Sequence, residues 1–420
     1  MIKASSLFYA IVVSIIIAIV SSSFILFAYT SRIEYDNQEI QQRLNLNVQS
    51  GLNLLMSTQS LVNLNESKTI DLFGNNEDSV LLERKSWGAF EVIHSTAIFH
   101  QQKKERIAQI GFPRDSTDLY SIYLLDEGKP LALCGKTKIT GPVYLPKSGV
   151  QRAYIEGESY NDTKFIYGDI KTSKNSLPVF NKDLLEHIQQ LLKEKKATDA
   201  DSVMEVKRPI SGDSLFNSFK NNTLILKRHG LVKIDNGTYS GNIIIISDTL
   251  IVVSADAILK DVILAAPKIR FEKKFRGQLQ AYASDSIIVG DEASFAYPSV
   301  LGISSNNSAS KCVVLFGEKD TLVGNVFAHQ VMVDAYKRTG IRMGKKSLII
   351  GQLFSNGYAE VQGTIYGSVM CADFLLQTPS SIYENHLLNV GIDQSALPNY
   401  FTGINLVKEL SFKRIAKWLD

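Results

Sequence analysis

The feature that most constrains this chain is an apolar run close to its amino terminus. No charged residue and no proline occurs between Leu7 and Tyr29. A membrane-spanning helix needs about 20 predominantly apolar residues, whereas the apolar region of a cleaved secretory signal has roughly 7–15. The segment "FAYTS" at the end of the run offers a poor small-x-small cleavage site. The run therefore predicts a retained membrane anchor within residues 1–31, with a cleaved signal peptide as the alternative.

Charges on the two sides of the run predict its orientation. Lys3 and the terminal amine precede the run, and Arg32 follows it together with three acidic residues. Cationic flanks stay on the cytoplasmic side of a membrane. We therefore expect a single-pass protein of the inner membrane, with the bulk of the chain periplasmic or extracytoplasmic.

Composition agrees with one anchor that carries a water-soluble body. The chain has 420 residues and a net charge of +3, and its mean hydropathy is near zero, so no second membrane span is required. The residues beyond the anchor are sufficient for two or more hydrophobic cores. Basic residues are spread along the chain instead of clustering, so we expect the membrane as a partner and no nucleic acid.

The three cysteines argue against a cysteine-based framework. Cys134, Cys312 and Cys371 lie far apart, and no CxxC pair occurs. This pattern excludes a disulfide scaffold and a cysteine-built zinc site. Buried free thiols are favoured, and a bond between Cys312 and Cys371 would require the fold to bring them together.

A helical periodicity continues beyond the apolar run. Apolar residues recur at spacings of three, four and seven, on one face of an amphipathic helix: Ile33, Ile40, Leu44, Val48, Leu52 and Leu55. No proline occurs before Pro113. We therefore predict one long helix from about Ser6 to about Ser60, whose second half packs on a domain. A juxtamembrane linker helix is the alternative.

Between Thr69 and Gly135 the apolar period changes to two. The segments "WGAFEVIHSTAIFH" and "ERIAQIGF" flank the polar "QQKK", and "LYSIYLL" and "PLALCG" flank the turn "DEGK". These are strand–turn–strand signals. Together with the helix they predict a small α+β domain over residues 32–135, built on an antiparallel sheet.

Short β-branched runs punctuated by glycine follow, and they predict the start of a β-solenoid over residues 136–180. An amphipathic helix and a polar loop interrupt the solenoid over residues 181–222. Asn181 is a suitable N-cap. One face of the helix is apolar and consists of Leu184, Leu185, Ile188, Leu191 and Leu192.

Strand signals become dense over residues 223–385, and their spacing indicates repeats. Runs begin at Leu250, Ile269 and Ile287, so the repeat is 19 and then 18 residues long. Further on, "VGNVFA", "IGQLFS" and "QGTIYG" share a glycine that is followed by one variable residue and then by an apolar, an aromatic and a small residue. Repeats of about 20 residues cannot bury their own apolar faces singly, which is typical of a stacked solenoid. We predict a parallel β-solenoid, with a β-sandwich as the alternative.

The open end of a solenoid exposes unpaired backbone unless something covers it. Residues 386–420 end in a short amphipathic stretch, and we predict that they form a C-terminal cap, with a partner-binding tail as the alternative. The expected architecture is therefore mainly β. It combines an N-terminal transmembrane helix, a long helical stalk, a small α+β domain and a parallel β-solenoid with a helical insertion.

The repeats lack the residue clusters that enzymes on such a scaffold need. Acidic residues are scattered singly, and without a paired carboxylate signature they are more simply explained as turn formers. The histidines show no metal-ligand spacing, and no nucleophile, phosphate-loop or dinucleotide motif is convincing. We therefore predict a protein that is not an enzyme, with no catalytic residues, no cofactor and no metal.

The first residues resemble the processing region of type IV pilins and type II secretion pseudopilins. In that family a basic and then a small residue precede the cleaved bond, and a long apolar helix runs into an amphipathic half packed on a small sheet. The resemblance makes Lys3 the basic residue, Ala4 the small residue before the cut and Ser5 the new, methylatable terminus. The fifth mature position, which is normally glutamate, is Tyr9 here.

That departure implies a particular place in the machine. The glutamate of the family neutralises the terminal amine of a neighbouring subunit inside the membrane, where an unpaired charge is costly. A subunit without it resembles the minor pseudopilin that sits at the filament tip and initiates assembly. The resemblance therefore implies other envelope or filament subunits and secreted protein cargo as partners, in a type II secretion or type IV pilus-like machine.

Two other interpretations remain open. The glycine-punctuated strands also resemble bactofilin-like polymer-forming proteins, which would make the chain an anchored scaffold of the cell envelope. The helix after Asn181 and the predicted cap would obstruct such end-to-end stacking. A third interpretation is an anchored glycan-binding or glycan-processing β-helix protein, whose chemistry would need carboxylates that the repeats do not pair.

Overall fold

The computed structural model describes residues 4–57, 61–74, 77–113, 120–193, 202–205, 212, 214–306, 312–331, 339–407 and 412–419. The chain divides into two compact units. The first, here called the helix unit, comprises Met1–Leu55, Ser60–Arg84 and Ile93–Arg106. The second, called the ladder unit, comprises Met56–Gln59, Lys85–Val92 and Ile107–Asp420. The fold is mainly β with one long apolar helix at the amino terminus, which confirms that part of the prediction.

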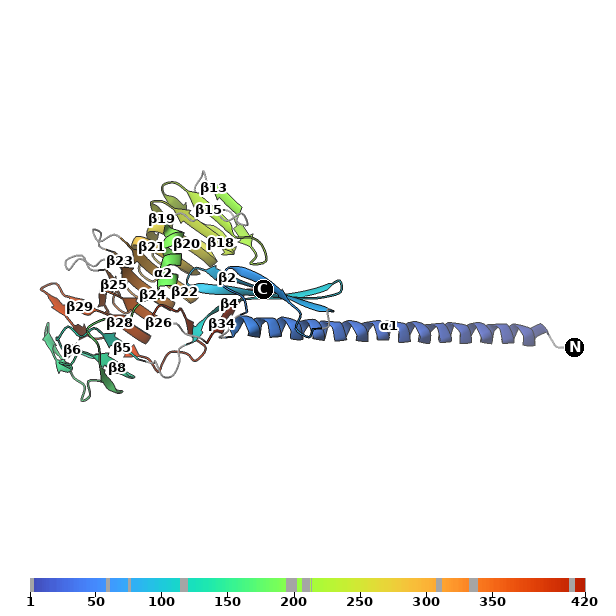
Figure 1. Ribbon diagram of the computed structural model, residues 1–420, viewed down its shortest axis with the longest axis horizontal. Helices are drawn as coiled ribbons and strands as arrows, with labels where there is room; N and C mark the ends of the chain where they lie inside the picture. The colour runs from blue at the N-terminus through green and yellow to red at the C-terminus, as the bar shows by residue number, and fades with distance from the viewer. Residues whose placement is uncertain are drawn as a thin grey trace. The chain divides into compact units, whose positions relative to one another are not determined.

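The helix unit contains α1, drawn in blue in Figure 1, and parts of an antiparallel sheet. Helix α1 runs without interruption over Ala4–Met56. The strands are β1 Glu66–Ile70, β2 Asp78–Trp87, β3 Phe90–Phe99 and β4 Gln102–Pro113, of which the last three contribute residues to both units. Strands β1 and β2 pair antiparallel, with Glu66 opposite Arg84 and Ile70 opposite Val80.

The second half of α1 packs on this sheet through the predicted apolar face. Its fully buried residues include Leu44, Val48, Leu52 and Leu55. Ile33, nearer the amino terminus, is 42% exposed. Helix and sheet come close at Gly51, where a Cβ would lie 2.8 Å from Leu82 Cδ2. Burial of one face in this way, more than helix propensity, stabilises helices in proteins.

Among its described residues, the ladder unit contains one helix, α2 Lys182–Leu192, and many strands. The strands before α2 are β5 Ile122–Leu124, β6 Leu131–Cys134, β7 Lys138–Thr140, β8 Val143–Leu145, β9 Val150–Arg152, β10 Tyr154–Ile155, β11 Glu158–Ser159 and β12 Ile170–Thr172. The next are β13 Ser202–Glu205, β14 Ser214–Asn217, β15 Leu224–Arg228, β16 Val232–Ile234, β17 Gly237–Gly241, β18 Ile243–Ser247, β19 Leu250–Val253, β20 Ala257–Phe271, β21 Arg276–Val289 and β22 Ser294–Ser305. The last are β23 Val313–Leu315, β24 Thr321–Gln330, β25 Gly340–Arg342, β26 Leu348–Ser355, β27 Tyr358–Glu360, β28 Thr364–Cys371, β29 Asp373–Gln377, β30 Ile382–Glu384, β31 His386–Leu388, β32 Gly391–Asp393, β33 Thr402–Gly403 and β34 Arg414–Trp418.

Most of these strands pair in parallel and belong to one or more of three ladders, whereas β6, β9 and β31 form a separate parallel sheet and β10 pairs antiparallel with β11. The first ladder runs β13–β15–β18–β20–β21–β22–β24–β26–β28–β5–β8–β12. The second runs β16–β19–β20–β21–β23–β25–β27–β29. The third runs β14–β17–β20–β21–β22–β24–β26–β28–β32–β7. Long strands such as β20 belong to more than one ladder, because different stretches of the same strand pair within different ladders.

The first predicted repeat spacing agrees with the observed register to within one residue. Ile251, Ile269 and Ile287 stand opposite one another in the second ladder, where the sequence predicts runs that start at Leu250, Ile269 and Ile287. The two spacings are regular because no long insertion separates these strands.

The glycine motif of the later repeats predicts one of its two strand pairings correctly and the other incorrectly. Gly324 and Gly351 are partners, as "VGNVFA" and "IGQLFS" predict, but the next partner is Gly367 of "YGSVMC" and not Gly363 of "QGTIYG". A Cβ on Gly351 would overlap the carbonyl oxygen of Gly324, and a Cβ on Gly367 would overlap that of Gly351. The stacked backbones therefore require glycine at this position, because only glycine lacks a Cβ.

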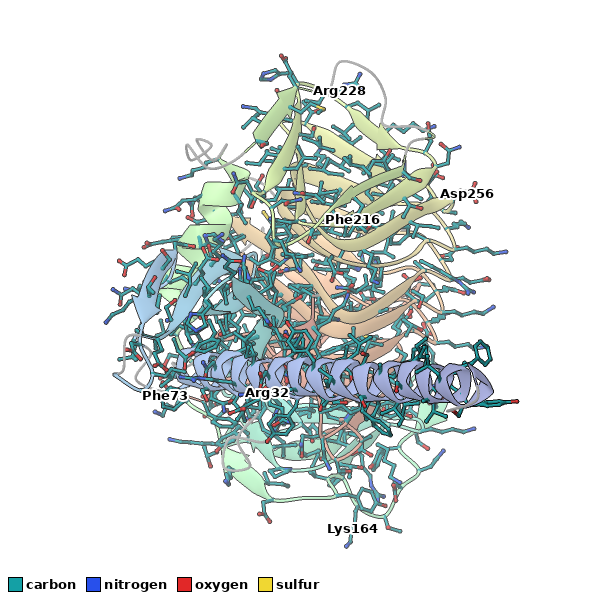
Figure 2. All side chains as sticks on the ribbon, turned by 90° about the vertical axis from the view of Figure 1, so that its right-hand side faces the viewer. Arg32, Phe73, Lys164, Phe216, Arg228 and Asp256 are labelled. Atoms are coloured by element: carbon teal, nitrogen blue, oxygen red, sulfur yellow. The ribbon has the colours of Figure 1, made fainter. Side chains whose placement is uncertain are left out.

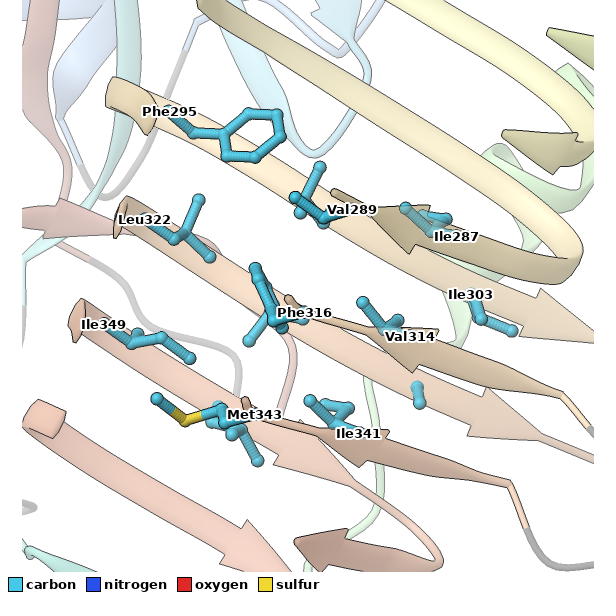
Figure 3. Close-up of a cluster of buried hydrophobic side chains, with 14 of the residues drawn as sticks. Ile287, Val289, Phe295, Ile303, Val314, Phe316, Leu322, Ile341, Met343 and Ile349 are labelled. Carbon is cyan, nitrogen blue, oxygen red and sulfur yellow. The ribbon is translucent and has the colours of Figure 1, made fainter. Parts of the chain in front are cut away.

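Apolar side chains fill the space between the ladders. They stack in columns with one residue from each repeat, such as Ile287, Val314 and Ile341, or Phe295, Leu322 and Ile349 (Figure 3). Each repeat therefore buries its apolar residues against the repeats before and after it.

Helix α2 covers part of the outer face of the first ladder. The side chain of Asn181 accepts a hydrogen bond from Leu184 N at 3.3 Å, which confirms the predicted N-cap. Leu185, Ile188 and Leu191 are buried, in an apolar cluster that also holds ladder residues of β18 and β20. The predicted helix and its apolar face are thus observed.

The hairpin predicted from "LYSIYLL", "DEGK" and "PLALCG" is not formed. Strand β5 pairs in parallel with β28 and β8, and β6 pairs in parallel with β31 and β9. The turn itself is present, since Asp126 Oδ1 accepts from Gly128 N at 3.0 Å and Gly128 has a φ of +79°. A corner between two ladders needs the same turn chemistry as a hairpin, so the local signal does not distinguish them.

The order of the repeats departs from the order of the chain. Strands β7 and β8, from the predicted starting segment 136–180, pair with β32 and β5. The described residues of 386–420 differ from the predicted cap, because β31 and β32 belong to parallel pairs and β33 and β34 pair antiparallel with β4. Strand β32 already has β7 as its next partner, so its backbone needs no separate cap.

Candidate functional site

Two regions carry candidate functional residues, and the first is the amino-terminal half of α1. Lys3 lies outside the described residues, as do the side chains of Ala4 and Ser5, so the processing positions stay predictions. Tyr9 is 67% exposed, and its ring lies 6.0 Å from that of Phe8. Within the described ranges, α1 is the one helix long and apolar enough to cross a membrane, and its most apolar stretch is not buried against the protein.

Polar contacts attach the second half of α1 to the sheet of the helix unit. Arg43 Nε donates to Asp78 Oδ2 at 2.7 Å, and its guanidinium lies 4.5 Å from the centre of the Phe99 ring. The Asp78 side chain is fully buried, whereas that of Arg43 is 33% exposed. The hydrogen bond with Asp78 raises the pKa of Arg43. The buried carboxylate therefore has its charge partner on the helix.

The second region is a pocket of about 640 Å³ within the ladder unit. One side of it is the first ladder, where Phe354 of β26, Met370 of β28, Tyr123 of β5 and Tyr144 of β8 follow one another in register. The other sides are segments without regular structure before α2 and near the carboxyl terminus.

The tyrosines of the pocket are held by contacts between their rings. The rings of Tyr123 and Tyr144 lie 5.4 Å apart with an angle of 27° between their planes. Lys171, the next residue in register, places its Nζ 5.5 Å from the centre of the Tyr144 ring. Tyr120 meets the other two tyrosines edge-on, at 6.0 and 6.1 Å. The two faces of the Tyr144 ring are therefore occupied by Tyr123 and Lys171.

A carboxyl-terminal segment, residues 401–407, forms one side of the pocket and is called the strap. Tyr297 Oη donates to Thr402 O and accepts from Thr402 N, both at 3.1 Å. Burial raises the pKa of Tyr297, so its hydroxyl stays protonated and able to donate. A Cβ on Gly403 would lie 2.9 Å from Gln352 Oε1. The strap therefore passes directly over this amide of β26.

The segment before α2 forms another side of the pocket. Hydrogen bonds attach this segment to the rest of the ladder unit near its two ends. Lys174 N donates to Tyr123 Oη at 3.4 Å. Asn181 N donates to Leu406 O of the strap at 2.6 Å. Between these attachments, residues 175–179 form no hydrogen bond with any other described residue. This side of the pocket is therefore its least constrained part.

The pocket lining is mostly apolar and positive in charge. Lys174 is the one charged residue among the described residues that line it, and no carboxylate contributes. Uncharged polar groups come from Thr172, Ser176, Gln352 and Asn405. Asn405 Oδ1 is buried and accepts no hydrogen bond from the described residues.

Several titratable residues of the repeats make structural contacts. Asp261 forms an ion pair with Lys417 at 2.6 Å. Asp320 is buried and accepts from Ala293 N at 2.9 Å, and burial raises its pKa to about 6. Among the described residues no three His, Cys, Asp or Glu side chains are placed to hold a metal. The three cysteines are buried and form no disulfide.

The sequence interpretation did not identify the pocket. The segment "LYSIYLL" supplies Tyr120 and Tyr123, and "PVYLP" supplies Tyr144, so tyrosines in two glycine-punctuated segments are the available local signal. No local sequence signal predicts that these rings lie near Met370 and Leu406. That proximity depends on the pairing of β5 with β28.

Comparison with protein-family models, with curated proteins and with solved structures finds no match to this chain. Function is therefore inferred from the contacts, burial and charges described above.

Proposed function

We propose that the chain is a single-pass, non-enzymatic membrane protein of the cell envelope that acts as an assembly or tip component resembling a minor pseudopilin. The observation that carries this proposal is the asymmetry of α1. Its first half is apolar and exposed, with Phe24 70% and Ile25 71% exposed, whereas its second half buries Leu44 and Leu52. An uninterrupted helix with these two halves suits a membrane segment that continues into a stalk.

The charges at the ends of the apolar half support the proposed orientation. Lys3 and the terminal amine lie on one side, and the first charged residue on the other side is Arg32, followed by acidic residues. Retention of the cationic amino-terminal flank in the cytoplasm would place both units on the periplasmic face of the inner membrane.

We further propose that the three ladders form a β-solenoid in which each repeat is one coil. Parallel pairing from repeat to repeat and the columns of buried side chains in Figure 3 support this proposal. A stack in which every coil bonds to its neighbours along its length is stiff. Such a body suits a component that presents a binding surface to envelope partners or secreted cargo.

The residue at position nine supports a tip position over one within a filament. Inside a membrane an unpaired terminal amine is costly, and a carboxylate of the neighbouring subunit can neutralise it. Tyr9 has a phenol side chain and no carboxylate. Tyr9 therefore cannot neutralise the terminal amine of a neighbouring subunit. A subunit at the end of a filament lacks a neighbour on one side, so the missing carboxylate matters less there.

Intact mass and amino-terminal sequencing of the protein from its native membrane test the proposal. A chain that begins at Ser5, with a methylated amine, would support the pseudopilin-like function. A chain that begins at Met1 would indicate a plain anchor and favour a scaffold. A chain that begins beyond about residue 30 would indicate a cleaved signal and refute both anchored functions.

One observation favours the alternative of a bactofilin-like scaffold. Among the strands that the structure describes, β13 and β12 stand at the two ends of the first ladder. Apolar side chains are exposed there, with Val203 51% and Ile170 57% exposed, and Phe216 of β14 is 72% exposed (Figure 2). Exposed strand edges can pair with further copies of a chain. Filaments of the detergent-solubilised full chain in electron microscopy would favour the scaffold, and single particles would favour the pseudopilin-like component.

A further inference from the structure

We propose that the pocket beside the strap binds one acyl chain of an amphiphile, with the chain inside and an anionic head group at Lys174. The ligand class is an acyl chain joined to a carboxylate or phosphate, either as a free fatty acid or as part of a lipid. This inference concerns the ladder unit alone and does not depend on the assembly function proposed above.

The size and composition of the pocket fit a ligand of this kind. Its volume of about 640 Å³ lies within the roughly 300–1,000 Å³ of small-molecule sites, which are lined mainly by apolar and aromatic side chains. Most of the described lining residues are apolar or aromatic, and the polar ones are few. A hydrocarbon chain gains most from such a lining, because its transfer from water is favourable in proportion to the apolar area buried.

The polarity of the lining changes from the inside to the mouth. Met370 and Leu406 are 0% and 1% exposed, and both are apolar. Thr172, Lys174 and Ser176 are exposed, and all three are polar. This arrangement orients an amphiphile with its chain inward and its head in water.

The charge of the mouth selects the head group. The amine of Lys174 has no ion-pair partner among the described residues. Lys171, which is not among the lining residues, places another positive charge beside the Tyr144 ring. With no carboxylate in the described lining, a carboxylate or phosphate on the ligand would supply the missing negative charge.

The ring geometry argues against a sugar as the ligand. Saccharide recognition by stacking needs an aromatic face that is open to the ligand. Tyr123 and Lys171 cover the two faces of the Tyr144 ring, and Tyr123 itself is only 8% exposed. The Tyr144 ring therefore offers no open face on which a sugar could stack.

Entry of the ligand is compatible with the contacts of the pocket sides. The strap is fixed by the two hydrogen bonds between Tyr297 and Thr402. Residues 175–179 lack hydrogen bonds to the described residues and include Val179, which is 72% exposed. We expect this segment to shift outward on binding while the strap stays in place.

Photo-crosslinking in nanodiscs of phosphatidylcholine tests the proposal on the full chain. The probe is a diazirine-bearing analogue of palmitic acid, and labelled peptides are identified by mass spectrometry. Labelling of peptides from β26, β28 or the strap supports the proposal, and labelling confined to α1 overturns it. A second arm uses the same diazirine in the acyl chain of phosphatidylcholine. It shows whether the acyl chain comes from a free acid or from a membrane lipid.

Variants with matched controls test the location of the chain and the head. Met370→Trp fills the inner end and should abolish pocket labelling, whereas Ile382→Trp at a 67% exposed position should not change it. Lys174→Glu should lower labelling by the acid about tenfold, or about 1.4 kcal/mol, and Lys164→Glu on the exposed surface should not.

Unchanged labelling in a folded Met370→Trp protein would overturn the proposal. Where that variant fails to fold, Val407→Trp on the half-buried rim takes its place with the same expected loss. Equal effects of Lys174→Glu and Lys164→Glu would refute the anionic head group.

Discussion

The packing of α1 on its sheet makes a quantitative prediction for two leucines of one helix. Leu52 is fully buried and Leu46 is 68% exposed. Leucine and alanine differ little in helix propensity, so Leu52→Ala and Leu46→Ala perturb the helix itself equally. Any difference between the two variants therefore reports the contact of the helix with the sheet.

The expected difference follows from burial. Removal of a fully buried leucine side chain costs about 2–5 kcal/mol, through lost burial and the cavity that remains. An exposed substitution usually changes stability by no more than about 0.5 kcal/mol. We therefore expect Leu52→Ala to lower the free energy of unfolding of the helix unit by at least about 2 kcal/mol and Leu46→Ala to leave it unchanged.

Hydrogen exchange of the full chain in nanodiscs measures this effect locally. The amides of β1 and β2, which pair with each other in the helix unit, should exchange about 30-fold faster or more in Leu52→Ala, since each 1.4 kcal/mol is a factor of about ten. Exchange in Leu46→Ala should match the parent chain. Equal protection of β1 and β2 in both variants would show that α1 does not stabilise the sheet, and the stalk interpretation would fail.

Three further changes test other contacts. Gly351→Ala should prevent proper stacking of β26, because its Cβ would overlap a backbone carbonyl, whereas Gly391→Ala meets only a side chain at 3.3 Å; thermal melts of the two variants check this. Because burial raises the pKa of Asp320 from 3.8 to about 6, the folded chain holds this proton more tightly than the unfolded chain. Stability should therefore fall by roughly 3 kcal/mol as the pH rises from about 4 to about 6. Asp320→Asn should remove that fall in urea titrations at pH 4 and pH 7. Arg43→Met should destabilise the helix unit because it leaves the buried Asp78 carboxylate without its charge partner, and adding Asp78→Asn should recover much of the loss in the same unfolding assay.

Features with local causes could be predicted from the sequence. The apolar run and the absence of proline predict α1, and the polar Asn181 before an apolar face predicts α2 and its N-cap. The register of Ile269 and Ile287 follows because the strands of the second ladder recur without insertions there. Each of these signals lies within one helix or one repeat of the chain.

The glycine motif shows where local pattern stops being sufficient. Gly363 and Gly367 both follow an exposed or half-buried residue and precede a short strand pattern, and both approach a backbone oxygen too closely for a Cβ. Gly363 meets the carbonyl oxygen of Ser347, while Gly367 meets that of Gly351. The two glycines therefore occupy different positions of the same repeat, Gly363 just before β28 and Gly367 within it, and only the register tells them apart.

The pocket could not be predicted because it is made by the non-sequential order of the stack. Strand β5 stands between β28 and β8 in the first ladder, so Tyr123 lies next to Met370, a residue far along the chain. The strap and the segment before α2 then meet through the hydrogen bond from Asn181 N to Leu406 O. Four separate parts of the chain must be in place before the cavity exists.

This order also makes the pocket a property of the completed fold. Strands β5 and β8 can extend the first ladder only after β28 has formed, and β28 in turn pairs with β26. A chain that ended before Thr364 would lack β28, one of the two partners of β5, and would also lack the strap. Any ligand of the pocket therefore binds the finished ladder unit and stabilises it by mass action, so its effect should appear in the exchange of β5 and β28 together and not in that of β1 and β2.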